Sequence, residues 1–298
     1  MKKTILIIPS DPDSVNYKIL KKSLFFFKKK NKNKYLFIGD KLNITKFLKY
    51  NKLNFINIAN KKNKTKTYLK NCFQTAFNLI KKKSAHGLIN LPLNKKNLPN
   101  NSVGFTEYLA KNFKKEGSET MLMYSNKFSV SPLTTHIAIK DIHKKINIKM
   151  ILKNIININN FYKRILGIKS PRICILGLNP HAGIDFKKKT EENKILIPAI
   201  KILKKNGINI IGPDSADSVF NNIYKNKINC IVGNYHDQVL PAFKYINKFK
   251  GANITLGLDF IRMSPDHGTG KNLKKINEIN NDSFIFCLNF FEKYYNKI

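Results

Sequence analysis

Hydrophobic and polar positions follow two alternating patterns along this chain. Short apolar runs that end in Gly, Pro, Asn or Asp are typical of buried strands, and they occupy residues 4–8, 35–39, 55–58, 87–91, 172–176, 208–211 and 230–233. Between them, apolar residues recur at helical spacing up to residue 27 and over 67–83, 141–166 and 284–295. Strands that alternate with amphipathic helices predict an α/β fold with largely parallel, mixed sheets.

Two segments depart from that alternation. Residues 120–124 and 128–130 are short apolar runs that follow each other closely, which predicts a hairpin. The polar stretch Asn94–Ser102 is the best candidate for a linker. No internal repeat is visible.

Composition sets limits on the class of protein. A length of 298 residues with 42% hydrophobic content predicts a globular protein with one large or two medium domains. The four cysteines form no C-x-x-C pair, which favours a reduced, cytoplasmic setting. The apolar run after Lys3 is too short for the core of a signal peptide, and no run is long enough to span a bilayer. We therefore expect no membrane association.

The formal net charge of +37 raises the question of a nucleic-acid partner. Among the 55 basic residues, only Arg164, Arg172 and Arg262 are arginines, although arginine is the usual residue for bidentate phosphate contacts. The lysines are spread along the chain and mixed with asparagine, which is typical of a general compositional bias. Nucleic-acid binding is therefore not favoured as the main function, and the sequence gives no reason for the charge.

Polar side chains gather where the expected strands end. The strand at 230–233 leads into Tyr235–Lys244, which contains a histidine, a carboxylate, an amide and a lysine and is, taken alone, equally compatible with a solvated turn. Four of the six histidines share such a position, namely His136, His181, His236 and His267. Ligands of α/β sheets bind beyond the carboxyl ends of strands, and neutral imidazoles bind divalent ions such as Zn²⁺, Co²⁺ and Mn²⁺. One shared metal site explains this pattern best.

Nucleotide motifs are missing from the sequence. Residues 268–272 lack the first glycine and the final Ser or Thr of a phosphate loop, and there is no G-x-G-x-x-G fingerprint. A nicotinamide cofactor would therefore bind in a manner unlike that of a Rossmann domain, and no cofactor-binding residue is assigned.

Six segments form a specific combination, namely Thr134–His136, Leu178–Gly183, Gly212–Asp217, Tyr235–Gln238, Asn253–Gly257, and Phe260–Arg262 with Asp266–Thr269. With these segments the chain resembles the PdxA family, the 4-hydroxythreonine-4-phosphate dehydrogenases of pyridoxal phosphate (vitamin B6) biosynthesis. The resemblance implies a two-domain α/β subunit similar to isocitrate and isopropylmalate dehydrogenases, with the active site in the interdomain cleft. We place the first domain at residues 1–103 plus 271–298 and the second, with most of the site, at 104–270. The family also implies a homodimer whose subunits share the active sites.

The resemblance also implies roles for individual residues. The metal ligands would be His136, His181 and His236, around one divalent ion (Zn, Mg, Co or Mn). The substrate-binding residues would be Thr106, Lys244, Asn253 and Arg262. Candidates for proton transfer, or for support of the metal ligands, are Asp217, Asp237 and His267. The implied reaction oxidises 4-phosphohydroxy-L-threonine with NAD⁺ or NADP⁺ and then releases CO₂, which gives 3-amino-2-oxopropyl phosphate.

Three positions depart from the family pattern. The glycine-rich first loop is replaced by Ser10–Asn16, the histidine of the G-H-T-E segment is Phe105, and the acidic residue after the P-H-A-G segment is Ile184. A related dehydrogenase for another phosphorylated 3-hydroxy acid, such as phosphothreonate or phosphoerythronate, is therefore an alternative. An alternative from another class is a basic, non-catalytic nucleic-acid-binding protein, which predicts strongly salt-dependent binding and no hydride transfer.

Overall fold

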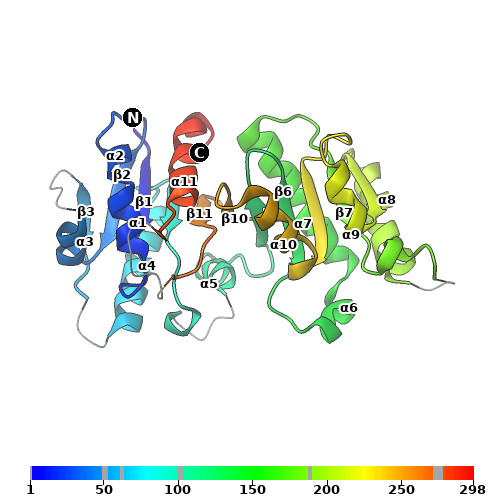
Figure 1. Cartoon of the computed structure of the whole chain (residues 1–298), viewed down its shortest axis with the longest axis horizontal. Helices are drawn as coiled ribbons and strands as arrows, with labels where there is room; N and C mark the ends of the chain where they lie inside the picture. Colours follow the sequence, from blue (N-terminus) through cyan, green and yellow to red (C-terminus); the bar gives the residue numbers. More distant parts are fainter. Residues whose placement is uncertain (1, 49–52, 61–63, 99–103, 187–189, 271–277) are drawn as a thin grey trace. The chain divides into compact units, whose positions relative to one another are not determined.

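The computed structural model describes residues 2–48, 53–60, 64–98, 104–186, 190–270 and 278–298. The chain divides into two compact units (Figure 1). The first unit combines residues 1–117 with 249–298, and the second is formed by residues 118–248. The predicted division places residues 104–117 and 249–270 in the second domain, whereas in the structure they pack with the first unit. Residue 103 and residues 271–277, at the predicted boundaries, lie outside the described residues, as do residues 99–102 of the expected linker.

The strands of the first unit lie in the order β3–β2–β1–β4–β11–β10. Their bounds are β1 Thr4–Ile8, β2 Lys34–Gly39, β3 Asn54–Asn57, β4 Gly87–Asn90, β10 Ala252–Leu256 and β11 Ile261–Pro265. Strand β10 runs antiparallel to β11, while the other neighbours are parallel. The helices are α1 Asn16–Lys22, α2 Leu24–Phe27, α3 Lys41–Leu48, α4 Thr65–Lys81, α5 Phe105–Asn112 and α11 Asp282–Lys293, with short turns η1 Lys95–Asn97 and η9 Tyr295–Lys297.

The core of the first unit forms where α4 packs on β1 and β2. Leu69, Phe73 and Phe77 recur at helical spacing on α4 and are buried. Each such side chain contributes about 1.5–3 kcal/mol through burial. Helix α11 packs on β10 and β11.

The strands of the second unit lie in the order β5–β6–β9–β7–β8. They are β5 Thr120–Tyr124, β6 Ser129–Thr134, β7 Ile173–Leu176, β8 Ile210–Asp214 and β9 Cys230–Tyr235. The predicted hairpin is confirmed as the antiparallel pair β5–β6, while the pairs β6–β9, β9–β7 and β7–β8 are parallel. The helices are α6 Ile142–Lys145, α7 Ile148–Phe161, α8 Ile197–Lys205, α9 Ala216–Val219 and α10 His236–Asn247. Shorter helical segments are η3 Ile139–Asp141, η4 Tyr162–Leu166, η5 Pro180–Gly183, η6 Glu192–Leu196 and η7 Phe220–Asn222.

The prediction of an α/β fold with largely parallel, mixed sheets is confirmed in both units. The prediction of one helix over 141–166 is wrong in detail, because α6 ends at Lys145 and α7 begins at Ile148. The side chain of Asn147 accepts a hydrogen bond from the backbone N–H of Met150 and caps α7. A capping asparagine competes with helix continuation, so hydrophobic spacing alone did not reveal the break.

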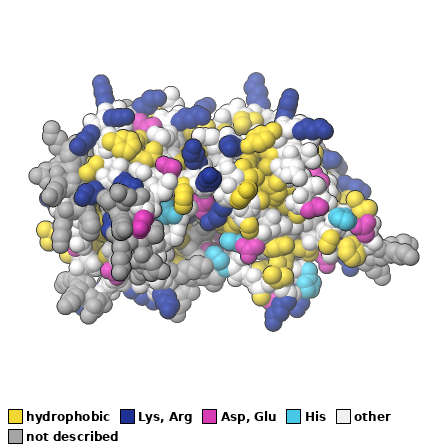
Figure 2. All heavy atoms as spheres, in the orientation of Figure 1, with side chains coloured by type: hydrophobic (Ala, Val, Ile, Leu, Met, Phe, Trp, Pro, Cys, Tyr) yellow, Lys and Arg dark blue, Asp and Glu magenta, His cyan; other side chains and the backbone are white. Residues whose placement is uncertain are grey.

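Charged side chains are widely distributed on the surface. On the face drawn in Figure 2, Lys and Arg side chains lie over both units, among neutral and apolar groups. No helix in the described ranges is both long and apolar enough to cross a membrane.

Candidate active site

Four parallel strands of the second unit bring candidate side chains to one edge of their sheet. His136 lies two residues beyond β6, and His236 begins α10 directly after β9. His181 lies in η5 after β7, and Asp217 lies in α9 after β8. Because β6, β9, β7 and β8 are parallel neighbours, their carboxyl ends share one edge. These four side chains therefore follow the strand ends at which ligands of α/β sheets bind.

Two of the expected metal ligands lie close together. The ring centroids of His136 and His236 are 6.1 Å apart, and the ring planes are inclined by 38°. His136 is exposed and His236 is half-buried. Both rings are therefore placed where a ligand from solvent can reach them.

Carboxylates orient two of the imidazoles. His181 Nδ1 lies 2.5 Å from Asp185 Oδ2, and His236 Nδ1 lies 2.7 Å from Asp237 Oδ1. A carboxylate at Nδ1 fixes the tautomer and leaves Nε2 as the nitrogen with a lone pair for a metal. Asp237 thus contacts the imidazole of His236, one of the expected metal ligands.

Asp185 was not among the residues expected from the sequence. Position 184, where the family carries an acidic residue, is an exposed isoleucine, and the carboxylate that reaches His181 comes from the next residue. The hydrogen bond that His181 Nδ1–H donates to Asp185 and the negative charge of Asp185 raise the pKa of His181, and the charge of Asp217 adds to this effect. The i, i+4 spacing of His181 and Asp185 is the signal that could have identified the pair.

The donor chemistry of these residues fits a divalent ion. Imidazole nitrogens held by carboxylates are common ligands of zinc and related metals. In the part of the chain that the structure describes, no three His, Cys, Asp or Glu side chains are gathered closely enough to hold an ion as they stand. The His181 side chain is 64% exposed and is in contact with Asp185.

A buried carboxylate shapes the loop that carries His181. Glu192 is only 2% exposed, and its Oε1 accepts hydrogen bonds at 2.8 Å from the backbone N–H groups of Leu178 and Asn179. Its Oε2 accepts a third bond from Asn179 Nδ2 at 2.9 Å. Gly183 has φ +75°, and a Cβ there would lie 2.6 Å from Glu192 Oε2, so this position requires glycine. Glu192 and Gly183 together determine the path of the loop around His181.

Replacing Glu192 with glutamine is expected to lower the free energy of unfolding by about 2 kcal/mol, since one amide oxygen cannot replace a carboxylate that accepts three bonds. Burial raises the pKa of Glu192, but the hydrogen bonds from Asn179 and Thr190 lower it by more. The pKa of Glu192 is therefore below its ordinary value. A carboxyl whose pKa is lowered on folding stabilises the folded state at pH values above its unfolded pKa, which is about 4.3 for glutamate. This stabilisation is lost as the pH falls below that value and through the folded pKa. Denaturant unfolding of E192Q and the parent chain should therefore differ at pH 7 and converge below about pH 4. The exposed Glu116→Gln serves as control, and an equal loss in both variants would contradict the role of Glu192.

The first unit contains a buried cation. Arg262, on β11, is 3% exposed, and its Nε donates to Asn90 Oδ1 at 2.7 Å while Nη1 donates to Thr255 Oγ1 at 3.2 Å. No carboxylate of the described chain forms an ion pair with it. Desolvation lowers the pKa of this guanidinium to about 9, so it remains charged at neutral pH. A buried charge whose described partners are neutral is suited to receive an anionic ligand.

Phe105 lies against that guanidinium. The Cζ of Arg262 is 4.6 Å from the centroid of the Phe105 ring, which in turn lies 4.7 Å from the ring of Phe73. A cation over an aromatic face is stabilised by about 0.5–2 kcal/mol. Phe105, which stands where the resemblance predicts a histidine, thus packs against the guanidinium of Arg262.

The other expected residues are distributed between the units. Thr106 lies in the first turn of α5, and Asn253 lies on β10, where its Oδ1 is buried and has no hydrogen-bond partner among the described residues. His267 follows β11, and its Nδ1 lies 2.9 Å from the carbonyl oxygen of Gly268. Lys244 is exposed on α10 in the second unit. The three histidines, both aspartates and Lys244 thus belong to one unit, and the remaining substrate candidates belong to the other.

Comparison with known proteins gives the family. The family model described as pyridoxal phosphate biosynthetic protein PdxA matches residues 3–290. The chain belongs to the PdxA family. A 4-hydroxythreonine-4-phosphate dehydrogenase of Wigglesworthia glossinidia brevipalpis is 48% identical over 61% of this chain and 54% of its own length. The enzyme of the same name from Sulfurihydrogenibium sp. is 41% identical over 64% of this chain and 59% of its own.

These alignments cover little more than half the length of the curated PdxA relatives. The fold similarity extends further. The crystal structure of 4-hydroxythreonine-4-phosphate dehydrogenase from Klebsiella pneumoniae has a TM-score of 0.80 and 24% identity, covering 97% of this chain and 99% of that one. The fold similarity and the match to the family model therefore both extend along nearly the whole chain, whereas the pairwise alignments with the curated relatives cover about three fifths of it.

Proposed function

We propose that this PdxA-family chain oxidises 4-phosphohydroxy-L-threonine with NAD⁺ or NADP⁺ and decarboxylates the product to 3-amino-2-oxopropyl phosphate, as a step of pyridoxine 5′-phosphate biosynthesis. The observation that carries the proposal is the placement of His136, His181 and His236 at neighbouring strand ends. Two of these imidazoles have carboxylates at Nδ1. Relatives that bear the name 4-hydroxythreonine-4-phosphate dehydrogenase supply the substrate class.

Cationic and amide groups are assigned to the anionic substrate. Arg262 offers a guanidinium whose recorded partners, Asn90 and Thr255, are neutral, so its remaining N–H groups can pair with a phosphate or carboxylate. Asn253 adds a buried amide oxygen for the substrate's ammonium or hydroxyl group. Lys244 and Thr106 supply an ammonium and a hydroxyl for the remaining oxygens.

Imidazoles and carboxylates are assigned to the reacting centre. A divalent ion held by His136, His181 and His236 would supply Lewis-acid polarisation of the hydroxyl that is oxidised. Asp217, which follows β8 and whose charge raises the pKa of His181, is assigned the role of receiving the hydroxyl proton on a carboxylate oxygen. Asp237 Oδ1 would accept the hydrogen bond from His236 Nδ1–H, which leaves Nε2 as the nitrogen with the lone pair. His267 is the alternative proton carrier.

A second copy of the chain is proposed as the partner. The second unit exposes large apolar side chains that neighbour the candidate ligands in sequence, namely Ile137, Ile139, Ile184, Phe186 and Tyr245. Ile139, Ile184 and Tyr245 are 78%, 82% and 86% exposed. Apolar groups exposed in such number are typical of surfaces that another chain covers. A homodimer in which each subunit completes the other's active site would cover them.

The test is formation of NADH from 4-phosphohydroxy-L-threonine and NAD⁺, with and without a chelator and with Zn²⁺, Co²⁺ or Mg²⁺ restored. We expect turnover that the chelator abolishes and a divalent ion restores, because the hydroxyl proton is weakly acidic without a Lewis acid. Turnover that persists after complete metal removal would contradict the three-histidine assignment. Light scattering of the same preparation gives the oligomeric state.

A related substrate remains a second candidate because of Phe105. Its ring occupies one face of the Arg262 guanidinium, where a histidine would add a hydrogen-bonding group. Phosphothreonate and phosphoerythronate lack the amino group of the first substrate and are assayed beside it. Turnover of either, with none of 4-phosphohydroxy-L-threonine, would transfer the proposal to that acid.

A further inference from the structure

A cavity of about 710 Å³ lies within the first unit, away from the residues assigned to catalysis. Its walls come from the end of α4, the segment that leads into β4, the end of α5, and the residues just before β11. The strands β4 and β11 are parallel and begin here, so the cavity is at their amino ends. Neither Arg262 nor any other candidate site residue lines it. Its volume is within the range of pockets that hold small organic ligands.

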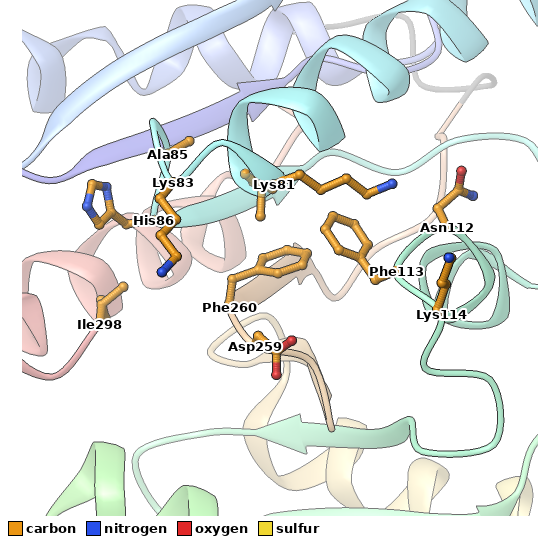
Figure 3. Close-up of a pocket in the computed structure, with 11 residues that line it drawn as sticks. Lys81, Lys83, Ala85, His86, Asn112, Phe113, Lys114, Asp259, Phe260 and Ile298 are labelled. Carbon is orange, nitrogen blue, oxygen red and sulfur yellow. The ribbon is translucent and has the colours of Figure 1, made fainter.

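Aromatic rings form the apolar part of the cavity. The rings of Phe113 and Phe260 have centroids 4.8 Å apart and are inclined by 50°. Both side chains are half-buried, and Figure 3 shows them next to each other in the middle of the lining. Ile80 and Ala85 extend this surface. A recessed apolar surface of this kind favours a ligand with an apolar, preferably aromatic, body.

Basic side chains surround the rings. Lys81, Lys83 and Lys114 line the cavity, and Lys81 Nζ lies 5.4 Å from the centroid of the Phe113 ring. The acidic residue of the lining, Asp259, is 3.2 Å from Lys115 Nζ and is thus already paired with a cation. Ile298, the last residue of the chain, also lines the cavity and carries the α-carboxylate. The three lysines still outnumber these two carboxylates. Lysines are common on this chain, and these three are exposed, but they also line an aromatic recess.

His86 adds a directed donor. The backbone N–H of Thr4 donates to His86 Nδ1 at 3.3 Å, so the neutral ring carries its proton on Nε2. His86 lines the cavity and is half-buried. An Nε2–H group in this tautomer donates to an anionic oxygen and does not accept from a cation.

We propose that this cavity binds a small aromatic anion, a monophosphate or a carboxylate, with its ring on Phe113 and Phe260. Lys81 and Lys114 lie on one side of these rings and Lys83 and His86 on the other (Figure 3), so the charged group of the ligand would pair with the basic groups on one side. Such a ligand matches both features of the lining, whereas a free inorganic anion leaves the aromatic walls exposed to water and a neutral aromatic molecule leaves the cations unpaired. The site is independent of the proposed catalytic centre, because no residue is common to both.

Calorimetric titration of the full chain with phenyl phosphate tests the proposal, with benzoate, inorganic phosphate and benzyl alcohol as comparison probes. The exposed pair Lys83→Gln/Lys114→Gln is expected to weaken phenyl phosphate binding at least tenfold. The matched control, Lys66→Gln/Lys70→Gln, removes the same charge from exposed positions of α4 and should leave affinity unchanged. Inorganic phosphate and benzyl alcohol should each bind at least tenfold more weakly than phenyl phosphate, and the affinity for benzoate shows which anionic group is preferred.

A second titration distinguishes binding in the cavity from binding at the catalytic residues. In Arg262→Met, phenyl phosphate should bind to the cavity as it does to the parent chain. Loss of binding in this variant alone would place the ligand at Arg262 and overturn the proposal. Equal weakening in the two lysine pairs, or inorganic phosphate that binds as well as phenyl phosphate, would also overturn it, since either result reflects general attraction to a basic chain.

Discussion

Replacing His181 with alanine is expected to lower kcat/KM for metal-dependent oxidation by about a thousandfold or more, since the loss of one of three imidazole ligands removes the Lewis acid from the reacting hydroxyl. The fold should be unaffected, because the His181 side chain is 64% exposed and its recorded hydrogen bond is to Asp185, another exposed residue. Steady-state kinetics and bound-metal content, measured with thermal unfolding, check both statements.

The matched control for this substitution is His143→Ala, which removes another exposed histidine of the second unit. Metal content and kcat/KM of that variant should equal those of the parent chain. If the His181 variant retains both its metal and its turnover, the ligand assignment is wrong. If it loses thermal stability to a degree that the control does not, the role of His181 is structural and the assignment also fails.

Replacing Arg262 with methionine is expected to lower kcat/KM about a hundredfold or more, because a buried charged hydrogen-bonding partner contributes about 2–5 kcal/mol to the binding of an anion. The effect on stability should be small, since two changes oppose each other. The variant no longer buries a guanidinium whose pKa is lowered by desolvation, but it leaves Asn90 Oδ1 and Thr255 Oγ1 without their donor. Kinetics with the phosphorylated substrate and denaturant unfolding provide the two measurements.

Arg164→Met is the control for charge, because Arg164 is an exposed arginine in the other unit. It should leave both kinetics and stability unchanged. Arg262→Lys keeps a positive charge but cannot keep the planar contact with Phe105 or the two bonds to Asn90 and Thr255, so we expect an intermediate activity. Full activity in Arg262→Met would show that the substrate anion binds elsewhere.

The local pattern of the sequence was sufficient for the elements that depend on local physics. Apolar runs located β1 to β9 but not β10 and β11, and the polar residues after them located His136, His181 and His236 at strand ends. Strand register then places those ends side by side, as expected for parallel neighbours. The break between α6 and α7 was not predicted, because the helical spacing of hydrophobic residues continues past Asn147, which caps α7.

The sequence by itself determined the α/β class, the family resemblance, later matched over residues 3–290, and the positions of the candidate ligands. Only the tertiary structure revealed which groups contact one another. Arg262 on β11 donates a hydrogen bond to Asn90 on β4, 172 residues away in the sequence. Phe105, on α5, contacts the same guanidinium. Such contacts depend on how distant segments pack, and hydrophobic periodicity records only which face of each segment is buried. For the same reason, nothing in the local sequence predicts that Glu192 is buried or that it accepts hydrogen bonds from the loop before His181.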